Sequence, residues 1–505
     1  MTQLYPSIAT VRRLARRYDR IPLYRELDLS AVGLLSLLKA LQDSPHVVLL
    51  ESARAGGAWN RFSFIGLGAR RSVSCEPPMV IEEVDGVRTG RRVNFFDFLK
   101  EETARHTSPA FARFGSFNGG LVGYFAYDLA NETGVLRKNI RRDGDAPAAF
   151  LVQVDDFIVY DNRLDRSHVA ACMYVDRSRP LAGQYRETAG RLEAMERDII
   201  ERLARTTLPY LPSRPAPLAV SFREERGSFE AKVSAAKDEI AAGEAIQVVL
   251  SMRADIHEPV DPFRFYLKLR MVNPSPYMFF LKQGNRHIVG SSPEIHVKVE
   301  DDTVYLKPIA GTIPRGRTAR ENRENRATLL ADPKERAEHL MLVDLARNDL
   351  GRIAAPGSVR VDRFMEPEDY SHVIHLVSLT TCALGEGRDA VDALRETFPA
   401  GTVSGAPKVR AMELIDAMEG RARGIYAGAV GYIGYNGRLD TCITIRTAVF
   451  DGDRRYIQAG AGIVHDSVPA REYDEIVHKL RALSLSLQFA RENTIEETAR
   501  AADYR

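Results

Sequence analysis

Cysteine is scarce in this sequence, and the four cysteines among its 505 residues lie far apart, at positions 75, 172, 382 and 442. No two of them form a CxxC pair, and none shares metal-ligand spacing with a histidine. The sequence therefore gives no sign of a cysteine-held metal site. We expect these residues to be buried or half-buried free thiols in a reducing compartment.

Long apolar runs are also missing. No stretch approaches the roughly 18–20 apolar residues that a membrane span needs, and arginines interrupt residues 11–20, where a signal peptide would have its hydrophobic core. Apolar residues make up 45% and charged residues 27% of the chain, which is typical of soluble proteins. We therefore expect a soluble, cytoplasmic protein.

Neither sign of charge is in excess. The 70 basic and 68 acidic residues leave a formal net charge of +2, which provides no field for wrapping nucleic acid. Phosphate-binding loops and dinucleotide fingerprints of the expected form are absent too. The sequence thus predicts no nucleic-acid partner and no membrane partner.

The most proline-dense stretch, Leu208–Pro217, follows a helical pattern at about 180–205 and marks a seam between two sequence regions. Length alone favours roughly three domains. We predict an N-terminal region (1–207), a proline-rich connector (208–223), a catalytic region (224–490) and a C-terminal tail (491–505).

Strand-like runs dominate the N-terminal region, whereas the C-terminal region mixes strands with helices. Aliphatic or aromatic enrichment predicts strands over 46–51, 61–66, 121–124 and 150–160. Apolar stripes at helical spacing predict helices over 334–350 and 470–487. Strands of several kinds with flanking helices indicate an α+β fold rather than a regular βαβ array.

Five short polar blocks are set between core-like runs of the C-terminal region. They combine carboxylates, glycines, a threonine and basic residues, which suit a pocket for a small anion and a hard cation. The blocks are Gly290–Glu294, Pro308–Thr312, Glu335–His339, Gly401–Lys408 and Gln458–Gly462, the last running on to Glu475. In this order they resemble the chorismate-utilising enzymes, and most closely the large subunits (component I) of anthranilate synthases.

The resemblance extends from about Tyr24 to about Leu487 and implies a fold, a reaction and partners. The implied fold is a large sandwich of mostly antiparallel sheets flanked by helices. The implied reaction converts chorismate and ammonia to anthranilate and pyruvate, the first step of tryptophan biosynthesis. Ammonia would come from glutamine through a separate glutamine amidotransferase subunit (component II), in a heterotetramer, and tryptophan would inhibit the enzyme.

Carboxylates on two predicted helices indicate a magnesium site. Glu335 and Glu338 are three residues apart and share a helix face, and Glu472, Glu475 and Lys479 share a face of the last helix. Mg²⁺ prefers a few carboxylates, several waters and an oxygen of the ligand. The resemblance implies that Glu338 and Glu475 hold the metal, which binds the ring carboxylate of chorismate. Glu335 and Glu472 would lie beside these two ligands without binding the metal directly.

The second carboxylate of chorismate needs a different partner. Arg446 offers the planar fork suited to a carboxylate, and small residues at 460–462, which we expect to follow a strand, let backbone N–H groups approach an anion. The resemblance implies that chorismate is bound by Glu294, Gly311, Thr312, Tyr426, Arg446, Gly460, Ala461, Gly462 and Lys479.

The reaction needs acid and base groups. Loss of the ring hydroxyl requires a general acid, and the elimination of pyruvate requires a base at C2. His375, in a strand-like apolar run, and Glu335 are the candidates, and the sequence does not say which serves which step. Thr402, just before a helix N-terminus that would attract anions, is the third catalytic residue that the resemblance implies.

Two positions separate this chain from related enzymes. Isochorismate and salicylate synthases carry a water-activating lysine where this chain has Gln247, and aminodeoxychorismate synthases usually carry a lysine where it has Ala310. Both substitutions favour ammonia as the nucleophile and anthranilate as the product. The alternatives are an aminodeoxychorismate or 2-amino-2-deoxyisochorismate synthase and, from a different class, a non-catalytic tryptophan-binding protein.

Two further blocks carry no catalytic chemistry. Ser52 ends a predicted strand, and Pro276, Tyr277 and Met278 lie in a proline-stiffened turn that enters another strand. The resemblance assigns these four residues to a tryptophan feedback site. A polar anchor, an aromatic ring and a thioether suit an indole with an amino acid head group. We therefore expect tryptophan to bind between the two sequence regions.

Overall fold

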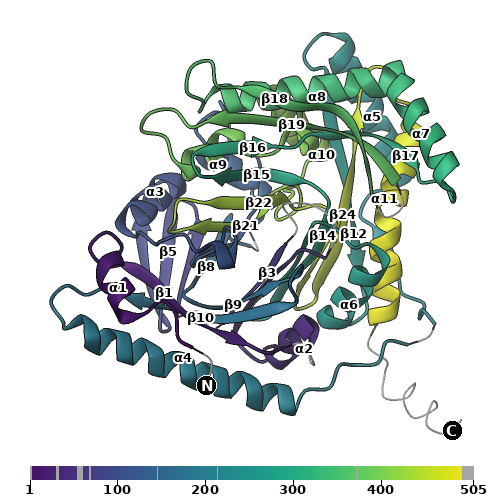
Figure 1. Ribbon diagram of the computed structural model, residues 1–505. Helices are drawn as coiled ribbons and strands as arrows, with labels where there is room; N and C mark the ends of the chain where they lie inside the picture. Colours follow the sequence, from purple (N-terminus) through teal and green to yellow (C-terminus); the bar gives the residue numbers. More distant parts are fainter. Residues whose placement is uncertain are drawn as a thin grey trace, which may run out of the picture.

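In the part of the chain that the structure describes, two sheets of twelve strands each form a sandwich whose outer faces are covered by helices (Figure 1). The computed structural model describes residues 3–29, 33–53, 61–67, 70–144, 146–212, 214–370 and 373–491. Neighbouring strands pair antiparallel in both sheets. The predicted α+β sandwich of antiparallel sheets is confirmed.

The first sheet joins strands from both ends of the chain. Its strands in spatial order are β1 (Arg20–Leu27), β10 (Arg166–Tyr174), β9 (Asp156–Asp161), β3 (Phe62–Gly66), β2 (His46–Glu51), β13 (Tyr277–Gln283), β14 (Arg286–Ser292), β23 (Thr447–Asp451), β24 (Arg454–Ile463), β12 (Gln247–Ile256) and β11 (Val220–Phe222), with β20 (Gly405–Ala406) beside β12. The contact between β2 and β13 joins the N-terminal strands to the later ones.

The second sheet has the same mixed origin. Its strands in spatial order are β17 (Ile309–Pro314), β19 (Val373–Ala383), β16 (Thr303–Leu306), β15 (Ile295–Glu300), β22 (Leu439–Ile443), β21 (Ala429–Gly434), β7 (Gly120–Phe125), β8 (Ala149–Val154), β4 (Arg71–Glu76), β5 (Met79–Val84) and β6 (Val87–Arg92), with β18 (Arg360–Asp369) beside β19. The regions before and after the connector therefore interleave in both sheets. The division at 208–223 stays a prediction, and all but the first residue of the tail lies outside the described residues.

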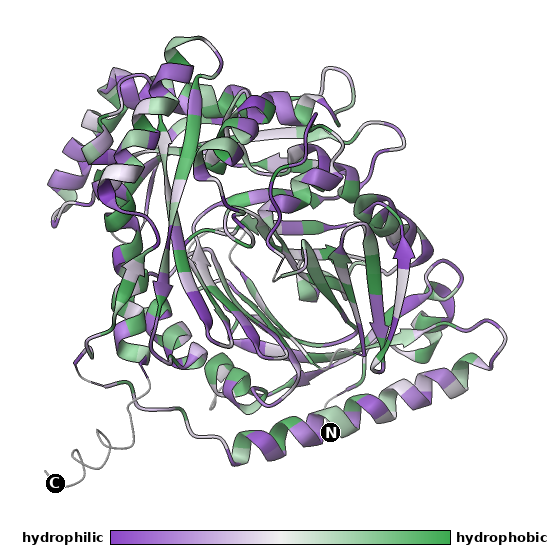
Figure 2. Cartoon of the chain, turned by 180° about the vertical axis from the view of Figure 1, so that it is seen from behind, coloured by the Kyte–Doolittle hydropathy of each residue, from purple (hydrophilic) through white to green (hydrophobic). Residues whose placement is uncertain are grey.

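Helices pack on the outer faces of the sandwich. They are α1 (Ile8–Leu14), α2 (Gly33–Ala40), α3 (Phe95–Arg105), α4 (Leu181–Ala204), α5 (Arg226–Ala241), α6 (Pro262–Val272), α7 (Ala319–Ala331), α8 (Pro333–Gly351), α9 (Ala390–Thr397), α10 (Lys408–Glu419) and α11 (Pro469–Ala490). Hydrophilic and hydrophobic residues alternate along the long α4 in Figure 2, as expected of a helix with one face on a sheet. No helix among the described residues is long and apolar enough to cross a membrane.

Apolar side chains fill the space between the two sheets. The ring of Phe117 lies between Phe157 of the first sheet and Tyr432 of the second, with ring centroids 5.2 and 5.0 Å away. Separate apolar clusters lie under the helices on each outer face. The four cysteines are buried free thiols, as the sequence predicts.

The predicted strands match the structure except over 150–160. That run forms two strands, β8 and β9, which belong to different sheets. Apolar residues lie on both sides of the pair Asp155–Asp156, and their pattern does not reveal that the chain crosses between sheets there. The turn directs β8 and β9 to opposite sides of the sandwich.

Local sequence sets the start of α8, which carries part of the candidate site. The Asp332 side chain accepts hydrogen bonds from the N–H groups of Lys334 and Glu335, and Pro333 occupies the first helical position. This cap fixes Glu335 in the first turn of the helix. In the same way, Pro469 begins α11 and places Glu472 in its first turn.

Candidate active site

The five polar blocks meet at one cavity of about 380 Å³. It lies between β12 and β24 of the first sheet, β17 and β19 of the second, and the helices α8 and α11. The expected catalytic, substrate and metal residues that line it are Glu294, Gly311, Thr312, Glu335, Glu338, His375, Thr402, Tyr426, Arg446, Gly460, Gly462, Glu472, Glu475 and Lys479. The fold thus brings residues that are up to 185 positions apart in the sequence into one pocket.

Ala461 is the exception among the expected residues. It is fully buried in the apolar cluster on the other face of β24 and does not line the cavity. We expected residues 460–462 to follow a strand, and this was wrong. They lie within β24, opposite Leu250 and its neighbours in β12. Because side chains alternate between the faces of a strand, only Gly460 and Gly462 face the cavity.

Gly460 permits a close approach of several groups. A Cβ atom at this position would lie 2.7 Å from the Tyr426 hydroxyl and 2.8 Å from a backbone oxygen of β12, so a side chain cannot be accommodated. The Gly460 carbonyl accepts a hydrogen bond of 2.8 Å from Lys479 Nζ and therefore points away from β12. Since N–H and C=O of one strand residue point the same way, the Gly460 N–H is also directed away from β12.

Four carboxylates crowd the other side of the cavity. Burial raises the pKa values of Glu335, Glu338 and Glu472 above the ordinary value, and the negative charge of Glu475 raises them further. The only cation paired with them at short distance, among the described residues, is Lys479, whose Nζ lies 2.7 Å from Glu475 Oε1. Excess negative charge at this side favours a bound cation.

The side chains of this carboxylate cluster are of the type that Mg²⁺ prefers. Within the described part of the chain no three such side chains are close enough together to form a complete metal cage. Mg²⁺ usually takes only one or two protein carboxylates and completes its octahedron with waters and substrate oxygens. Glu338 and Glu475, one from each helix, are suited to that role, and their mutual repulsion is what a divalent cation would neutralise.

His375 is held at the edge of the cavity by β17. Its Nδ1 lies 3.1 Å from the Gly311 carbonyl oxygen and 3.0 Å from Thr312 Oγ1, and the Tyr370 ring packs edge-on at 4.9 Å. A carbonyl can only accept a hydrogen bond, so we assign the proton to Nδ1. The lone pair of the neutral ring is then on Nε2, which could accept a proton.

Gly311 makes this arrangement possible. The register of β17 against β19 shifts between Ala310 and Thr312, and Gly311 has φ +68°, a conformation that favours glycine. This bulge turns the N–H of Thr312 toward Glu335, whose Oε2 accepts it at 3.2 Å. Hydrogen bonds therefore link the backbone of β17 both to His375 and to Glu335.

Glu294 is the most strongly perturbed acid of the cavity. Only 8% of it is exposed, and burial raises its pKa to about 8, although the Thr402 hydroxyl and the positive charges of Arg446 and Lys479 act in the opposite direction. At neutral pH this carboxyl is mostly protonated. A protonated carboxyl in a reactive pocket can serve as a general acid, a role that we did not assign to it from the sequence.

Arg446 presents a buried positive charge to the cavity. Burial lowers its pKa, and its guanidinium has no hydrogen bond or ion pair with any described residue. Its backbone has φ 52° in the irregular segment between β22 and β23, where its carbonyl accepts the Ser291 N–H at 3.1 Å. A buried cation with no hydrogen-bonded counter-ion among the described residues favours a bound carboxylate.

Gln247 is a cavity residue that we considered only as the replacement for a lysine. Its side chain is 4% exposed, and its Oε1 has no hydrogen-bond partner among the described residues. A Cβ atom at position 462 would lie 2.6 Å from its Nε2, so Gly462 provides the space for this amide. The unpaired oxygen can accept a hydrogen bond from a small donor.

A separate cavity of about 270 Å³ contains the four expected tryptophan-site residues in its lining. The Ser52 hydroxyl donates to the Pro276 carbonyl at 3.4 Å, and the Tyr277 hydroxyl donates to Asp440 at 2.9 Å. Met278 is 1% exposed and packs into the apolar cluster on the other face of β13. Asp440 was missed by the sequence analysis, although a carboxylate within an apolar strand was a usable signal.

Two short paths connect the separate cavity with the larger one. Tyr277 pairs with Ser292 across β13 and β14, and Glu294 follows two residues later. From the other side, Asp440 and Ile443 belong to β22, and the Ile443 N–H donates to the Glu294 carbonyl at 3.1 Å. Tyr277 and Asp440 are therefore each linked to the backbone of Glu294 by a short run of chain.

Comparisons with known proteins agree with this geometry. The sequence pattern of chorismate binding enzymes matches residues 49–484. Anthranilate synthase component 1 from Aquifex aeolicus is 41% identical over 500 residues, covering 97% of this chain and 99% of the relative. The crystal structure of anthranilate synthase component I from Streptococcus pneumoniae superimposes with a TM-score of 0.71 at 34% identity, covering 86% of this chain and 94% of that one.

A more distant structure shares the fold alone. The menaquinone-specific isochorismate synthase from Escherichia coli has a TM-score of 0.66 at 20% identity, with 95% of this chain and 98% of that chain covered. The pattern match over most of the chain and the full-length relatives with about 40% identity are decisive for the family. This chain belongs to the family of chorismate binding enzymes.

Proposed function

We propose that this chain is the large, chorismate-binding subunit of an anthranilate synthase and catalyses the first step of tryptophan biosynthesis. The observation that carries the proposal is one cavity with the buried carboxyl of Glu294, the buried guanidinium of Arg446 and a cluster of carboxylates opposite. The names of the full-length relatives support the same activity.

Chorismate has two carboxylates, and the cavity has two different sites for them. Arg446 and the backbone N–H of Gly460 would bind one carboxylate. The other would face Glu338 and Glu475, where Mg²⁺ would orient it and withdraw negative charge from the ring. The ring would then lie in the cavity that Glu294 and His375 both line.

The first step adds ammonia to C2 of chorismate while the ring hydroxyl leaves. Glu294, protonated at neutral pH, donates its proton to that hydroxyl, so that water departs. The Gln247 Oε1 accepts a hydrogen bond from ammonia and holds it toward the ring. An amide is too weak a base to activate water, which favours ammonia over water as the nucleophile.

The second step removes the proton at C2 and expels pyruvate, which makes the ring aromatic. Nε2 of His375 is the base, since Nδ1 donates to the Gly311 carbonyl. Glu335 accepts the Thr312 N–H and thereby keeps the strand segment next to the imidazole in place. This division assigns the histidine to the base role and Glu294 to the acid role.

Anthranilate fluorescence tests the proposed activity directly. We expect the purified chain to produce anthranilate from chorismate, an ammonium salt and Mg²⁺. Consumption of chorismate without anthranilate would instead indicate an aminodeoxychorismate or 2-amino-2-deoxyisochorismate synthase. A chain that consumes no chorismate under these conditions would contradict the proposal.

Under the same proposal, ammonia comes from glutamine through a separate component II subunit, in a cytoplasmic heterotetramer. The names of the relatives, each a component 1, support a partner of this kind. Free ammonium should replace the partner in the assay of the isolated chain.

Tryptophan inhibition is part of the proposal, and Ser52 provides its test. The smaller cavity combines the Ser52 hydroxyl, the Tyr277 ring and the Asp440 carboxylate, which suit an amino acid with an aromatic side chain. Inhibition follows if tryptophan binds better to the arrangement in which Glu294 is displaced.

We expect Ser52→Ala to raise the tryptophan concentration for half-inhibition roughly threefold to tenfold, because one hydrogen bond contributes about 0.5–1.5 kcal/mol. The measurement is the rate of anthranilate formation against tryptophan concentration. Ser44→Ala, just before the start of β2, should leave the inhibition curve unchanged. If both variants and the unaltered chain have the same inhibition curve, Ser52 does not bind the inhibitor.

A further inference from the structure

A buried ion pair lies behind the active-site cavity without lining it. Glu419 is the last residue of α10, and Arg423 follows four residues later. The guanidinium grips the carboxylate with two hydrogen bonds, from Nη2 to Oε1 at 2.6 Å and from Nε to Oε2 at 3.0 Å. The two side chains are only 8% and 1% exposed, and burial of two charges is costly. The proposed function uses neither of them.

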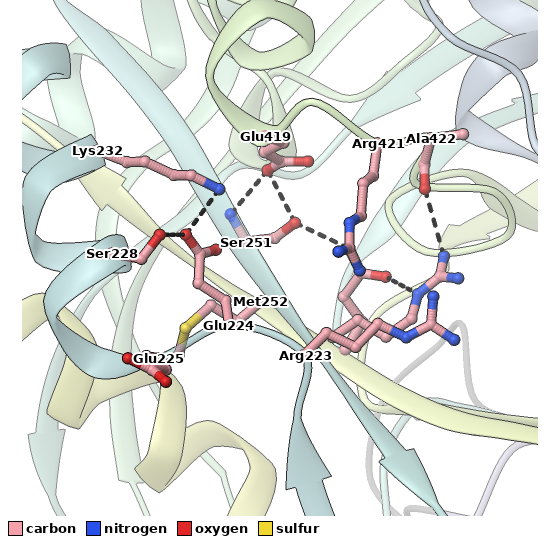
Figure 3. A pocket seen from close by; sticks show the side chains of 12 residues that line it. Arg223, Glu224, Glu225, Ser228, Lys232, Ser251, Met252, Glu419, Arg421 and Ala422 are labelled. Carbon is pink, nitrogen blue, oxygen red and sulfur yellow. Dashed lines mark hydrogen bonds and ion pairs between the residues drawn. The ribbon is translucent and has the colours of Figure 1, made fainter.

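The pair fills a gap along one edge of β12. The short strands β20 and β11 pair with the two ends of this edge. Between them, the Val249 carbonyl accepts a hydrogen bond of 2.5 Å from Arg423 Nη2. The N–H and the hydroxyl of Ser251 both donate to Glu419 Oε1, at 2.8 and 2.9 Å (Figure 3). Buried backbone groups need partners, so these two side chains take the place of a neighbouring strand.

The same guanidinium contacts two further walls of the cavity. Its Nη1 donates to the carbonyl of Val403, the residue after Thr402, at 2.7 Å. The guanidinium carbon lies 5.8 Å from the ring centroid of Tyr426, whose hydroxyl faces Gly460. Arg423 therefore joins β12, the segment that carries Thr402, and Tyr426 from behind.

The geometry of these contacts requires a guanidinium. Its N–H donors form a planar fork, and Arg423 uses four of the five, in three directions. Burial lowers the pKa of Arg423, but Glu419 and Tyr127 outweigh burial and hold it above the ordinary value, so the group stays charged. A lysine has all its donors on one nitrogen and cannot reach the same set of acceptors.

We propose that Arg423, held by Glu419, is a positioning residue that fixes three walls of the active site against one another. This inference rests on the proposed function, which needs the Thr402 hydroxyl beside Glu294 while Tyr426 faces the substrate. Arg423 does not line the cavity, so it acts through the residues that it holds. A displacement of about 1 Å in such a site can lower the rate about 100-fold.

Arg423→Lys tests the proposal, because it keeps the charge and loses the fork. We expect kcat for anthranilate formation to fall about tenfold to 100-fold at saturating chorismate, ammonium and Mg²⁺. The Thr402 hydroxyl lowers the pKa of Glu294. Displacement of Thr402 should therefore raise this pKa and move the alkaline fall of kcat up by about 0.5–1 pH unit. Arg446 and Lys479, the charged groups that act on Glu294, stay unaltered in the variant.

Arg71→Lys is the matched control. Arg71 is also a half-buried to buried arginine that holds a glutamate, with its Nη1 2.5 Å from Glu102 Oε1, and it does not line the active-site cavity. This variant should lower the Tm but keep the kcat and the alkaline fall of the unaltered chain.

Glu419→Gln is the second variant and decides the test if Arg423→Lys does not fold. It keeps an acceptor for the Ser251 N–H but removes the ion pair, so both changes should be smaller and in the same direction. Variants that keep the kcat of the unaltered chain, that lose kcat with an unmoved alkaline fall, or that both fail to fold would overturn the inference. An unaltered chain that makes no anthranilate from chorismate and ammonium would overturn the proposed function, and this inference with it.

Discussion

Replacement of Glu294 by glutamine is expected to lower kcat for anthranilate formation by about 10²–10⁴-fold, the usual contribution of a positioned general acid. Glutamine keeps the size of the side chain but has no acidic proton to give to the departing hydroxyl. Arg446 still offers its guanidinium to a substrate carboxylate in this variant, so KM for chorismate should change far less than kcat. Initial rates of anthranilate fluorescence at saturating Mg²⁺ and ammonium measure both quantities.

The pH profile distinguishes an acid from a structural residue. Burial raises the pKa of Glu294 to about 8. An acid acts only in its protonated form, so kcat should fall as the pH rises through this value, and Glu294→Gln should lose this alkaline limb. A flat profile through that pH in the unaltered chain would contradict the assignment.

Asp128 provides the matched control for this experiment. It is also a buried carboxyl whose pKa is raised by burial, to about 6, and it does not line the active-site cavity. Asp128→Asn should therefore leave kcat and the alkaline limb unchanged. Equal losses of kcat in Asp128→Asn and Glu294→Gln would mean that a buried carboxyl matters for the fold rather than for proton transfer.

The sequence was sufficient for the fold class and for most element positions. The predicted strand over 46–51 is β2, and the helices predicted over 334–350 and 470–487 are α8 and α11 within a few residues. These elements have clear periodic patterns or strong caps. The change of sheet near Asp155 could not be predicted, because pairing partners are set by strands far away in the sequence.

Residue types in the site were easier to predict than their roles. The polar blocks identify Glu294 as a site residue, but its pKa depends on burial by distant segments, which raises it, and on Thr402 and Arg446, which lower it. The glycine pattern at 460–462 indicates a close backbone approach, whereas only the pairing with β12 shows that Ala461 faces the core. The chemical type of a side chain can be read from the sequence directly, whereas its burial depends on segments that are distant in the sequence.

A polar cavity of about 490 Å³, separate from the active-site cavity, had no usable signal in the sequence. Its lining comes from α5, β12, β24 and the segment after α10, and each contribution resembles an ordinary solvated face. Only the fold shows that the Gln458 amide donates a hydrogen bond to the Ser251 hydroxyl. Polar contacts between distant strands of this kind are where a structure adds most to sequence reasoning.

Loss of the metal carboxylates should have the other large effect on activity. Glu338→Gln and Glu475→Gln are each expected to raise the Mg²⁺ concentration for half-maximal rate by about 100-fold or more, since even the outer partners of metal ligands contribute about 10–100-fold to affinity. The double variant should make no measurable anthranilate. Asp344→Asn, an exposed carboxylate on the same helix, should leave the Mg²⁺ dependence unchanged.

Thermal unfolding gives a readout of the same site that does not require turnover. Burial and the charges of Glu335 and Glu475 raise the pKa of Glu338, so its ionised form destabilises the metal-free fold above the ordinary glutamate pKa. Mg²⁺ should relieve this repulsion and raise the Tm of the unaltered chain at neutral pH. Glu338→Gln removes one of the repelling charges, so its Tm without metal should be at least as high, and its Mg²⁺-dependent rise should be lost. A variant that keeps the full rise would show that Mg²⁺ binds elsewhere.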